Sequence, residues 1–387
     1  MANNNENKIL NVPNLRFPEF SGEWEMSSIG EQFELYSGNT PSRMNKNQFD
    51  GSINWITSGE LKEHYISDTK EKISEEAAKN NSLKLLPVGT FVIAIYGLEA
   101  NGVRGTCSIT TRESTISQAC MAFTSKMDIQ NEFLYSWYKK HGNIIGIKYA
   151  QGTKQQNLSY DIIERFNISY PCMEEQKKLI RFISLIDQRI ATQNKIIEDL
   201  KKLKSAITDL LFHSIADAHT IRLGEIAHIT NGAGDVQDAN TEHQEDWYPF
   251  FDRSEELKWF PTYSFDKEAV IYAGEGQSFY PRYYNGKFAL HQRCYAITDF
   301  ASCIIPKYCY HFMNTLNSYF VRNSVGSTVP SLRMDIFQKV EIRLPPIPKQ
   351  QHICKIIDAF YTKLEVEQRG ISILQELKQF LLSQMFI

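Results

Sequence analysis

Two long segments of the chain carry apolar residues at steps that are mostly three or four. The first segment follows Pro171 and the second follows Pro348. This spacing places the apolar side chains on one face of an α-helix. The apolar positions are Leu179, Phe182, Ile186, Ile190, Ile197, Leu200, Leu203, Ile207 and Leu210, and then Ile353, Ile356, Phe360, Leu364, Ile371, Leu374, Leu377 and Leu381. Because a solitary helix with one apolar stripe is marginal in water, we predict long helices over 172–214 and 347–387 that pair as a coiled coil.

The stretch before each predicted helix has a different pattern, in which short apolar runs alternate with Gly, Pro and Asn. The runs 89–97 and 269–273 are rich in β-branched residues and are bounded by turn residues, which indicates strands. The segments 71–81 and 132–141 are predicted to be helical. Mixed elements of this kind indicate an α+β globule before each long helix.

The chain is a tandem duplication. Residues near the end of the second copy lie 174 positions after their counterparts, as Asp335 does after Asp161. Further upstream the offset is 194, as for Gly224 after Gly30, so the second copy is shorter in its middle. Other matched pairs are Gly152 with Gly326, Pro171 with Pro345, Gln176 with Gln350, and Phe212 with Phe386. The duplication predicts one α/β domain over 1–171 and an equivalent one over 215–346, each followed by its helix.

Composition and charge narrow the function classes. The 387 residues are 42% hydrophobic and 22% charged, which is typical of globular domains, and the formal net charge is -3. A small, non-specific DNA-binding protein would be strongly basic, so the composition argues against that class. A sequence-specific binder stays compatible with this charge, because partner proteins can supply many of the contacts to the phosphate backbone.

Motifs for common enzyme chemistry are missing from the sequence. No G-x-x-x-x-G-K-[ST] phosphate loop occurs, and the run Asn-Gly-Ala-Gly at 231–234 lacks the third glycine of a dinucleotide site. The run Leu-Pro-Pro-Ile at 344–347 has Leu where an amino-methyltransferase needs a polar residue. The seven cysteines form no C-x-x-C pair, and the histidines lack the H-E-x-x-H spacing. We therefore expect no cofactor, no metal and no catalysis by this chain alone.

The apolar runs and the cysteines predict a cytoplasmic protein. Residues 1–8 are polar and lack the features of a signal peptide. No apolar run approaches the ~20 residues that span a bilayer, so no membrane contact is expected. The odd number of cysteines fits reduced thiols.

Several short motifs occur in a fixed order and point to one family. They are Val-Pro-Asn-Leu-Arg-Phe-Pro-Glu-Phe at 12–20, Ile-Gly-Glu at 29–31, Ser-Gly-Asn-Thr-Pro at 37–41, Ser-Gln-Ala at 117–119, Gly-Thr at 152–153, and Leu-Pro-Pro-Ile-Pro-Lys-Gln-Gln at 344–351. In this order, with a long helix after each copy, the chain resembles the specificity subunit of type I restriction–modification enzymes over essentially its whole length. The second copy departs from the pattern, with Asn-Gly-Ala-Gly at 231–234 and His-Gln-Arg at 291–293.

The resemblance implies a function and a set of partners. Each globule would be a target recognition domain that reads one half of a split sequence in double-stranded DNA. The two helices would act as spacers and dock two modification subunits, which carry S-adenosylmethionine and the methyltransferase chemistry. Restriction subunits with ATP and Mg would join that core. The chain itself would be a non-catalytic subunit without a cofactor.

Candidate DNA contacts follow from loops that combine Gly with hydrogen-bonding or basic side chains. Such side chains reach base edges or phosphates without belonging to regular elements. In the first copy the candidates are Arg43, Lys46, Tyr96, Asn101, Arg104, Thr153, Lys154, Gln155 and Asn157. In the second copy they are Tyr280, Arg282, Tyr283, Arg293, Ser327, Thr328, Ser331 and Arg333. A polar surface loop without function is the alternative interpretation for each of them.

Three other functions compete with the adaptor hypothesis. One is the specificity subunit of a related methyltransferase–nuclease system. Another is a stand-alone DNA-modifying enzyme with an unusual site, which would turn over S-adenosylmethionine without partners. The third is a coiled-coil scaffold unconnected with DNA, which would not shift DNA in a gel with or without a modification subunit.

Overall fold

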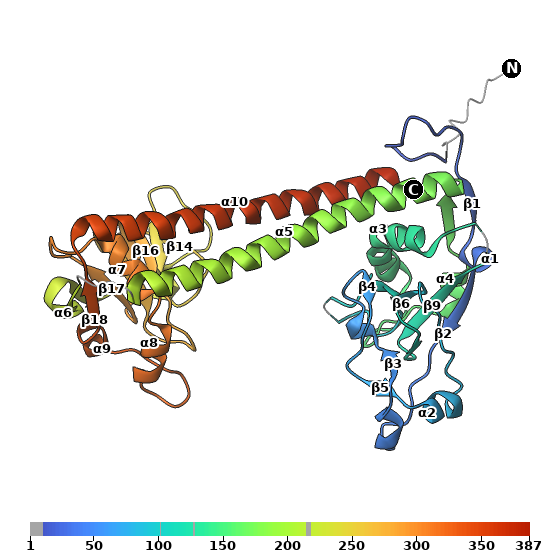
Figure 1. The fold of residues 1–387 in the computed structure, drawn as a ribbon, viewed down its shortest axis with the longest axis horizontal. Coiled ribbons are helices and arrows are strands. Elements are labelled where there is room, and N and C mark those ends of the chain that lie inside the picture. The colour runs from blue at the N-terminus through green and yellow to red at the C-terminus, as the bar shows by residue number, and fades with distance from the viewer. Residues whose placement is uncertain (1–10, 101, 127, 214–217) are drawn as a thin grey trace. The chain divides into compact units, whose positions relative to one another are not determined.

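The computed structural model describes residues 11–100, 102–126, 128–213 and 218–387, and the chain divides into two compact units (Figure 1). Unit 1 comprises Met1–Gln193 and Gly370–Ile387, and unit 2 comprises Asn194–Arg369. Each unit therefore contains one globule, one half of the first long helix and one half of the second. The sequence-based division into globules and spacers differs from this one, because the helix halves pack onto the globules.

The globule of unit 1 is built around a five-stranded sheet with the order β2-β9-β6-β7-β4. A three-stranded sheet, β5-β3-β8, and a two-stranded sheet, β1-β10, accompany it. The strands are β1 (Glu25–Ser28), β2 (Phe33–Ser37), β3 (Ile53–Ile56), β4 (Tyr65–Ile66), β5 (Lys72–Ile73), β6 (Phe91–Ala94), β7 (Cys107–Thr110), β8 (Ser114–Ile116), β9 (Cys120–Ser125) and β10 (Asn167–Tyr170). The helices are α1 (Ile29–Gln32), α2 (Glu75–Asn80), α3 (Asn131–Tyr149) and α4 (Tyr160–Glu164), with 3-10 turns at η1 (Lys46–Phe49) and η2 (Ser58–Glu60).

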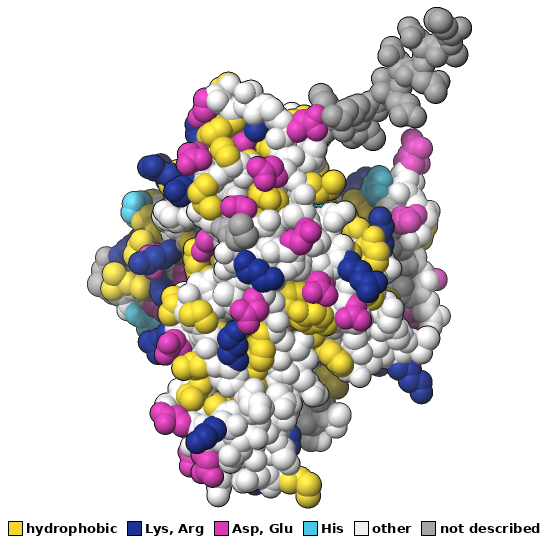
Figure 2. All heavy atoms as spheres, turned by 90° about the vertical axis from the view of Figure 1, so that its right-hand side faces the viewer, with side chains coloured by type: hydrophobic (Ala, Val, Ile, Leu, Met, Phe, Trp, Pro, Cys, Tyr) yellow, Lys and Arg dark blue, Asp and Glu magenta, His cyan; other side chains and the backbone are white. Residues whose placement is uncertain are grey.

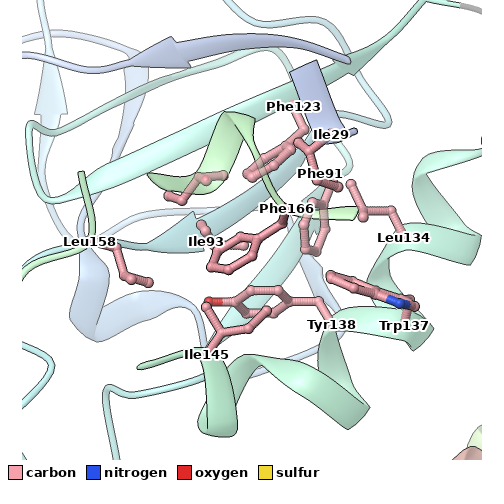
Figure 3. Close-up of a pocket in the computed structure, with 11 residues that line it drawn as sticks. Ile29, Phe91, Ile93, Phe123, Leu134, Trp137, Tyr138, Ile145, Leu158 and Phe166 are labelled. Atoms are coloured by element: carbon pink, nitrogen blue, oxygen red, sulfur yellow. The ribbon is translucent and has the colours of Figure 1, made fainter. Parts of the chain in front are cut away.

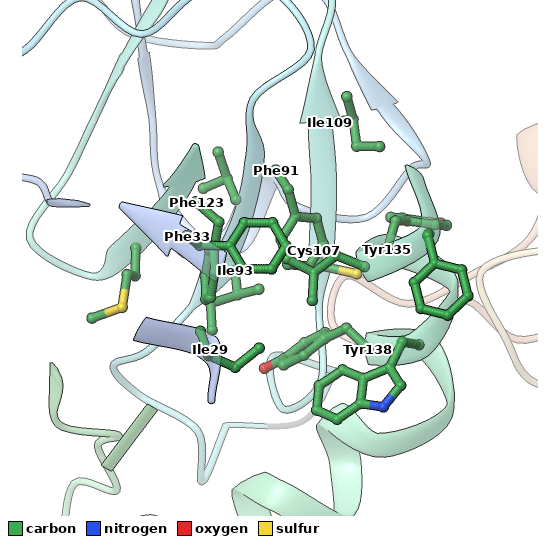
Figure 4. Close-up of a cluster of buried hydrophobic side chains, with 14 of the residues drawn as sticks. Ile29, Phe33, Phe91, Ile93, Cys107, Ile109, Phe123, Tyr135 and Tyr138 are labelled. Atoms are coloured by element: carbon green, nitrogen blue, oxygen red, sulfur yellow. The ribbon is translucent and has the colours of Figure 1, made fainter. Parts of the chain in front are cut away.

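Aromatic side chains from the sheet and from α3 form the core of unit 1 (Figure 4). The rings of Phe91 in β6 and Phe123 in β9 have centroids 5.3 Å apart, and the ring of Tyr138 in α3 lies 5.8 Å from Phe91. Burying a side chain such as Phe91 stabilises the fold by roughly 1.5–3 kcal/mol. The sheet and α3 are therefore held as one body, and this body positions the loops at the end of β6.

The globule of unit 2 contains a six-stranded sheet with the order β12-β17-β15-β16-β13-β14 and a two-stranded sheet, β11-β18. The strands are β11 (His219–Arg222), β12 (His228–Asn231), β13 (Tyr248–Phe251), β14 (Lys258–Phe260), β15 (Phe265–Ala273), β16 (Arg282–Leu290), β17 (Cys294–Thr298) and β18 (Glu341–Leu344). The helices are α6 (Leu223–Ile226), α7 (Pro306–Met313), α8 (Asn317–Asn323) and α9 (Met334–Gln338), with a 3-10 turn at η3 (Val236–Asp238). The two-stranded sheets β1-β10 and β11-β18 stand at equivalent places in the two copies, which confirms the tandem duplication.

The two long helices are α5 (Met173–His213) and α10 (Ile347–Met385), as the apolar period predicted. In unit 1, Leu179 of α5 shares a core with Leu381 and Met385 of α10. In unit 2, the end of α5 at Phe212 shares a core with Ile353 and Ile357 at the start of α10. In each unit the early part of one helix therefore packs beside the late part of the other, so the pairing is antiparallel.

The helix seam runs through Lys204 and Lys378, and three predicted members of the apolar stripe lie outside it. Leu203, Leu210 and Leu377 are 49%, 63% and 43% exposed. A coiled-coil seam repeats every 3.5 residues, so the seam of α5 passes from Leu200 to position 204 and not to 203. The aliphatic stem of a lysine can fill such a position while its ammonium stays near water. The assignment of these three leucines to the buried face was wrong.

A buried glutamine fixes the start of each long helix. The Gln176 Nε2 atom donates hydrogen bonds to Asp128 O (2.6 Å) and Pro171 O (3.0 Å), and its Oε1 atom accepts one from Gln130 N (3.0 Å). Gln350 makes the same set of bonds in unit 2: with Cys303 O (2.8 Å), Pro345 O (2.9 Å) and Ile305 N (2.9 Å). Both side chains satisfy buried backbone groups where the last strand turns into the helix.

The predicted helix over 71–81 is wrong in its first part. Lys72 and Ile73 form β5, and the helix α2 begins at Glu75. The hydroxyl of Ser74 accepts a hydrogen bond from Ala77 N, so Ser74 is the N-cap that starts the helix. Ile73 pairs with Ile53 of β3 and is buried, which keeps this segment extended.

Candidate nucleic-acid interface

Four segments of unit 1 meet at one edge of the five-stranded sheet, the edge at which β2 and β6 end and β7 and β9 begin. The end of β2 at Ser37 lies opposite Met121, and the end of β6 at Ala94 lies opposite Cys120, where β9 begins. β7 starts beside the end of β6, since Cys107 pairs with Ile93. The connections that leave this edge carry Arg43, Lys46, Tyr96 and Arg104. The topology thus brings together predicted contacts that are far apart in the sequence.

The loop 151–157 reaches the same edge and is closed at its base. Gln151 and Asn157 exchange two backbone hydrogen bonds of 2.8 and 2.9 Å. Gly152 has φ +111°, and a Cβ atom at this position would lie 2.0 Å from Gln155 O, so the turn requires glycine. The bond from Leu158 N to Ile95 O (2.9 Å) attaches the loop to the end of β6.

The loop exposes three of the predicted side chains and holds the fourth. Thr153, Lys154 and Gln155 are exposed. Asn157 is half-buried, and its Oδ1 atom accepts a hydrogen bond from Gly97 N (3.4 Å). The tip is therefore free to contact a ligand, whereas Asn157 links the loop to the β6–β7 connection.

Arg104 is a support of the loop in this structure. Its Nη2 atom donates a 2.7 Å hydrogen bond to Gln156 Oε1, and its stem crosses Gly146 of α3, where a Cβ atom would lie 2.5 Å from Arg104 Cγ. The N–H of Gln156 is bound in turn by Glu99 Oε2 (2.7 Å), and this bond lowers the pKa of the Glu99 carboxyl. Gln156 and Glu99 were not among the predicted residues, although Gln156 belongs to the same polar run.

Arg43 and Lys46 lie in the connection between β2 and β3. The Nη1 and Nη2 atoms of Arg43 both donate to the Glu71 carboxylate, the second at 2.9 Å. The guanidinium lies 4.7 Å from the Phe49 ring centroid and 5.2 Å from that of Trp55. The hydrogen bond raises the pKa of Arg43 and lowers that of Glu71. Lys46 is exposed at the start of η1. The predicted residue Asn101 lies outside the described residues.

Unit 2 repeats this arrangement. Val325 and Ser331 exchange backbone hydrogen bonds of 2.9 and 2.8 Å, and Gly326 has φ +102°. The bond from Leu332 N to Gly274 O (2.7 Å) attaches the loop to the end of β15. The loop tip exposes Ser327 and Thr328, whereas Ser331 closes the base of the loop as Asn157 does in unit 1.

Arg293 and Arg333 flank this second loop. Arg293 pairs with Glu275 at 2.9 Å, and Glu275 forms a β-bridge with Ser331, so Arg293 lies near the base of the loop. Arg333 is exposed at the start of α9 and lines a groove of ≈210 Å³ with Val325 and Asn323. Two basic side chains therefore lie near the base of this loop.

Of the remaining predicted residues, only Tyr280 lies in the β15–β16 connection. Arg282 and Tyr283 begin β16, where they pair with Ile271 and Val270 of β15, so their assignment to a loop was wrong, and both have internal partners. Arg282 donates to Ser254 O, and its guanidinium lies 5.9 Å from the Phe251 ring centroid. The Tyr283 hydroxyl donates to Glu268, and burial together with this carboxylate raises the pKa of Tyr283. Tyr280 is 58% exposed and lines a pocket next to α5. Only Tyr280 of the three presents most of its side chain to solvent.

Charge on the surface is mixed. On the face drawn in Figure 2, Lys and Arg side chains are interspersed with Asp and Glu side chains. A face with such mixed charge attracts a polyanion only weakly at long range.

An apolar pocket lies below the first loop, between Leu158, Ile145, Phe91 and Tyr138 (Figure 3). Its volume is ≈10 Å³, which is about the space that one water molecule needs. The Tyr138 hydroxyl is buried and has no hydrogen-bond partner among the described residues. A cavity of this size and lining is a packing feature of the core, and it is too small for a cofactor.

Two features are absent from the part of the chain that the structure describes. Within it, no group of three or more His, Cys, Asp or Glu side chains is placed to hold a metal ion. Among its helices, none is both long enough and apolar enough to cross a bilayer.

Two copies of one α+β domain, each with a glycine-dependent loop at the same sheet edge, define a duplicated recognition protein. A family model described as the type I restriction modification DNA specificity domain matches the chain twice, over residues 21–202 and 216–379. The chain belongs to this family.

Individual relatives agree with the family assignment. The chain is 24% identical over 412 residues to the type I restriction enzyme MjaIX specificity subunit of Methanocaldococcus jannaschii, with 94% of this chain and 92% of the relative covered. It is 31% identical over 165 residues to the EcoDI specificity subunit of Escherichia coli, with 42% and 36% covered.

Solved structures share the fold. The type I restriction-modification system S subunit from M. genitalium superposes with a TM-score of 0.60 at 16% identity, covering 97% of this chain and 99% of that one. A chain from a study of complex assembly and conformational transition of the type I R-M system has a TM-score of 0.63 at 15% identity, covering 94% and 97%.

Proposed function

We propose that this chain is the DNA-specificity subunit of a type I restriction–modification complex, in which each unit reads one half of a bipartite sequence. The observation that carries this proposal is the pair of loops 151–157 and 325–331, which have the same closure, the same glycine and the same attachment in a chain of this family. A duplicated chain with two equivalent loops suits two separate half-sites.

The exposed loop side chains would contact DNA, and the internally bound residues would support them. In unit 1 the contacts are Thr153, Lys154 and Gln155, with Lys46 for phosphate; in unit 2 they are Ser327, Thr328 and Arg333. Amide and hydroxyl groups pair with base edges, and lysine and arginine pair with phosphates or guanine. Arg43, Arg104, Arg282 and Arg293 already have protein partners, so they would need to exchange a partner in order to bind DNA.

Catalysis is assigned to partner proteins. Two modification subunits would dock on the paired helices and carry S-adenosylmethionine, and restriction subunits would carry ATP and Mg. The exposed side chains Leu203, Leu210 and Leu377 give the helices an apolar outer surface that such subunits could cover. The chain would act in the cytoplasm, where the DNA is.

Reconstitution with the modification subunit tests this function. The chain alone should neither methylate nor cleave DNA, whereas the complex should methylate a bipartite sequence. Exchanging residues 24–165 for the equivalent domain of a relative should change one half of that sequence and leave the other intact. Methylation by the chain alone would favour the stand-alone enzyme, and a complex that binds no DNA would favour the scaffold. A saturated complex with one modification subunit per chain would contradict the stoichiometry of two.

A further inference from the structure

A polar pocket in unit 2 lies where α5, α7 and α10 meet. Its volume is ≈310 Å³, at the lower end of the range for pockets that bind small molecules. Its lining includes Lys204 and Asp209 of α5, His311 of α7, Asn314 at the end of α7, and Tyr361 of α10. α7 is fixed against the long helices, since Phe312 packs on Phe212 with ring centroids 5.4 Å apart. The pocket is therefore part of the packed structure of unit 2.

The equivalent positions in unit 1 carry larger side chains that are bonded to the end of α10. Trp137 stands where unit 2 has His311, and its Nε1 atom donates a 3.1 Å hydrogen bond to Ile387 O. Lys140 stands where unit 2 has Asn314, and its ammonium donates to Ser383 O (3.2 Å) and Phe386 O. An ammonium at the last carbonyl groups of a helix is stabilised by the helix dipole. Unit 1 thus supplies its own cation at this place.

Unit 2 has no lysine at this place, because the residue equivalent to Lys140 is Asn314. The end of α5 is bound instead by Arg343, whose Nη1 atom donates a 3.0 Å hydrogen bond to His213 O, and His213 Nδ1 lies 2.7 Å from Asp209 O. Asn314 is shorter than Lys140, and its Nδ2 atom donates to the Tyr361 hydroxyl (3.2 Å). Asp209, which stands where unit 1 has Ser383, adds a carboxylate to the lining. His311 is buried with its Nε2 atom 2.9 Å from Asp358 Oδ1, and its Nδ1 atom has no hydrogen-bond partner among the described residues. A neutral imidazole that donates through Nε2 offers Nδ1 as an acceptor.

The lysine in the lining is directed to an aromatic ring. Lys204 Nζ lies 4.1 Å from the ring centroid of Tyr361, which is a cation–π contact. The Tyr361 ring therefore stabilises the Lys204 ammonium. The Asp209 carboxylate lines the same pocket and is exposed. Asp209 and Lys204 provide two charges of opposite sign whose effects on a ligand can be separated.

We propose that this pocket binds an alkylammonium or alkylguanidinium group, which takes the place that the Lys140 ammonium has in unit 1. The group has two natural sources, a Lys or Arg side chain of a partner protein and a free polyamine. The proposal goes beyond DNA recognition and does not depend on it, because the pocket lies within the chain itself.

Calorimetric titration of the full chain with agmatine tests the charge of the ligand. We expect saturable binding that is weakened about three- to tenfold by Asp209→Asn, because a unit charge near 4 Å contributes ~1 kcal/mol in water. Lys204→Gln should tighten binding, since it removes a like charge. 4-Guanidinobutyrate, which has a carboxylate in place of the ammonium group of agmatine, should bind more weakly than agmatine. No binding of agmatine, or the opposite sign for both variants, would overturn the proposal.

Variants that copy unit 1 test the location. Asn314→Lys gives unit 2 the ammonium that unit 1 has, and Thr208→Leu fills the lining with the residue type found at the equivalent Leu382. Both should abolish agmatine binding, and both should leave the thermal unfolding midpoint unchanged or raised. Unchanged agmatine affinity in a folded Asn314→Lys variant would show that the ligand binds elsewhere, which also overturns the proposal.

Repeating the titration on the complex with the modification subunit separates the two sources. Loss of agmatine binding in the complex, together with binding by the free chain, assigns the pocket to a basic side chain of that partner. Equal binding in both assigns it to a free polyamine. If no complex forms, the proposed function fails, while the titration of the free chain still decides whether the pocket binds a cation.

Discussion

The two units bring the same helices together with different chemistry at equivalent positions. In unit 1, Lys378 of α10 forms an ion pair with Asp187 of α5. In unit 2 the equivalent lysine is Lys204, and it packs on the ring of Tyr361, which stands where unit 1 has Asp187. The lysine has been kept in both copies and its partner has changed. The seam therefore requires the long aliphatic stem of a lysine at this position, whereas the group that contacts the lysine ammonium can vary.

In unit 1 further charged and aromatic groups lie near the ion pair between Asp187 and Lys378. The His64 ring lies between the rings of Tyr65 and Tyr135, at centroid distances of 4.1 and 3.9 Å. Its Nε2 atom is 2.9 Å from Glu132 Oε2, and its Nδ1 atom is 3.9 Å from Asp187 Oδ2. The attachment of the helices in unit 1 therefore depends on charged pairs. Removing one partner of such a pair leaves the other charge without compensation and destabilises the unit.

The largest difference between the units is expected for Arg16→Ala. Arg16 forms a bidentate pair with Glu175 at 2.8 and 2.7 Å, and the Glu175 side chain is 1% exposed. Removing Arg16 leaves a buried unpaired carboxylate, which should cost about 3–5 kcal/mol of unfolding free energy in unit 1. Hydrogen exchange resolved by peptide under urea measures this loss for each unit separately.

Lys349→Ala in unit 2 is the matched control. Lys349 stands at the position equivalent to Glu175 but is exposed, so its removal should change the stability of unit 2 by less than about 0.5 kcal/mol. Equal losses for Arg16→Ala and Lys349→Ala would show that the buried pair does not distinguish the units. Adding Glu175→Gln to Arg16→Ala should restore part of the loss.

Much of the fold could be predicted from the sequence because it has a periodic or repeated signal. The constant offset of the second copy and the 3.5-residue seam both appear as patterns along the chain. The pairing of Arg43 with Glu71 and of Arg104 with Gln156 could not be predicted, because each joins residues far apart in sequence with no period between them. These contacts depend on how the sheet brings its loops together.

The position of the seam was predictable only in part, for a related reason. Reading apolar residues alone placed Leu203 on the buried face, since leucine is more apolar than lysine. In the structure Lys204, and not Leu203, faces the other long helix. The hydrophobicity of the two residues does not indicate this. The pocket of unit 2 was missed as well, because its signal is a loss of volume relative to unit 1, which becomes visible only when both are compared in space.

The second prediction tests the seam with two neighbouring residues. Leu200 is half-buried on the seam and Leu203 is 49% exposed. Leu200→Glu should lower the stability of unit 2 by about 2–3 kcal/mol, because a charge enters an apolar contact. Leu203→Glu should leave stability unchanged but weaken binding of the modification subunit. Urea unfolding and a pull-down with that subunit measure the two effects.

Leu374→Glu repeats the first change in unit 1, where Leu374 is half-buried on the equivalent seam position. We expect a similar loss of stability there. If Leu203→Glu destabilised unit 2 as much as Leu200→Glu, the 3.5-residue seam through Lys204 would be wrong.

The third prediction concerns the glycines of the two loops. A Cβ atom at Gly152 would lie 2.0 Å from Gln155 O, and one at Gly326 would lie 2.8 Å from Val329 O. Gly152→Ala should therefore disturb its loop more than Gly326→Ala, with a cost of about 1–2 kcal/mol from the positive φ alone. Methylation assays of the complex on variant half-sites measure the consequence.

Each glycine variant should weaken discrimination in one half-site and leave the other unchanged. Lys154→Ala is the control for a contact at the loop tip, since the loop keeps its shape. If that residue contacts phosphate, binding should weaken uniformly across sequences and become less dependent on salt. If one glycine variant weakened discrimination equally in both half-sites, this would contradict the proposal that each unit reads one half-site.

The smallest effect is expected for the protonation of His311 in unit 2. Burial lowers the pKa of His311, and the nearby Asp358 only partly opposes this shift, with Lys307 and Lys204 acting in the same direction as burial. Because the folded state holds the proton less tightly than the unfolded state, the unfolded state gains protons first as the pH falls through the ordinary histidine range near ~6.5. Unit 2 should therefore lose stability between pH 7.5 and 5.5.

His311→Gln should remove this part of the pH dependence, because glutamine does not titrate. Unit 1 has Trp137 at the equivalent position and carries its own half-buried His141, whose pKa is also lowered by partial burial. His141→Gln should accordingly flatten the pH profile of unit 1 and leave that of unit 2 unchanged. Hydrogen exchange at both pH values, read separately for peptides of each unit, measures these slopes. A slope in unit 2 that survives His311→Gln would mean that another group is responsible, and that the two units respond to acid by the same means.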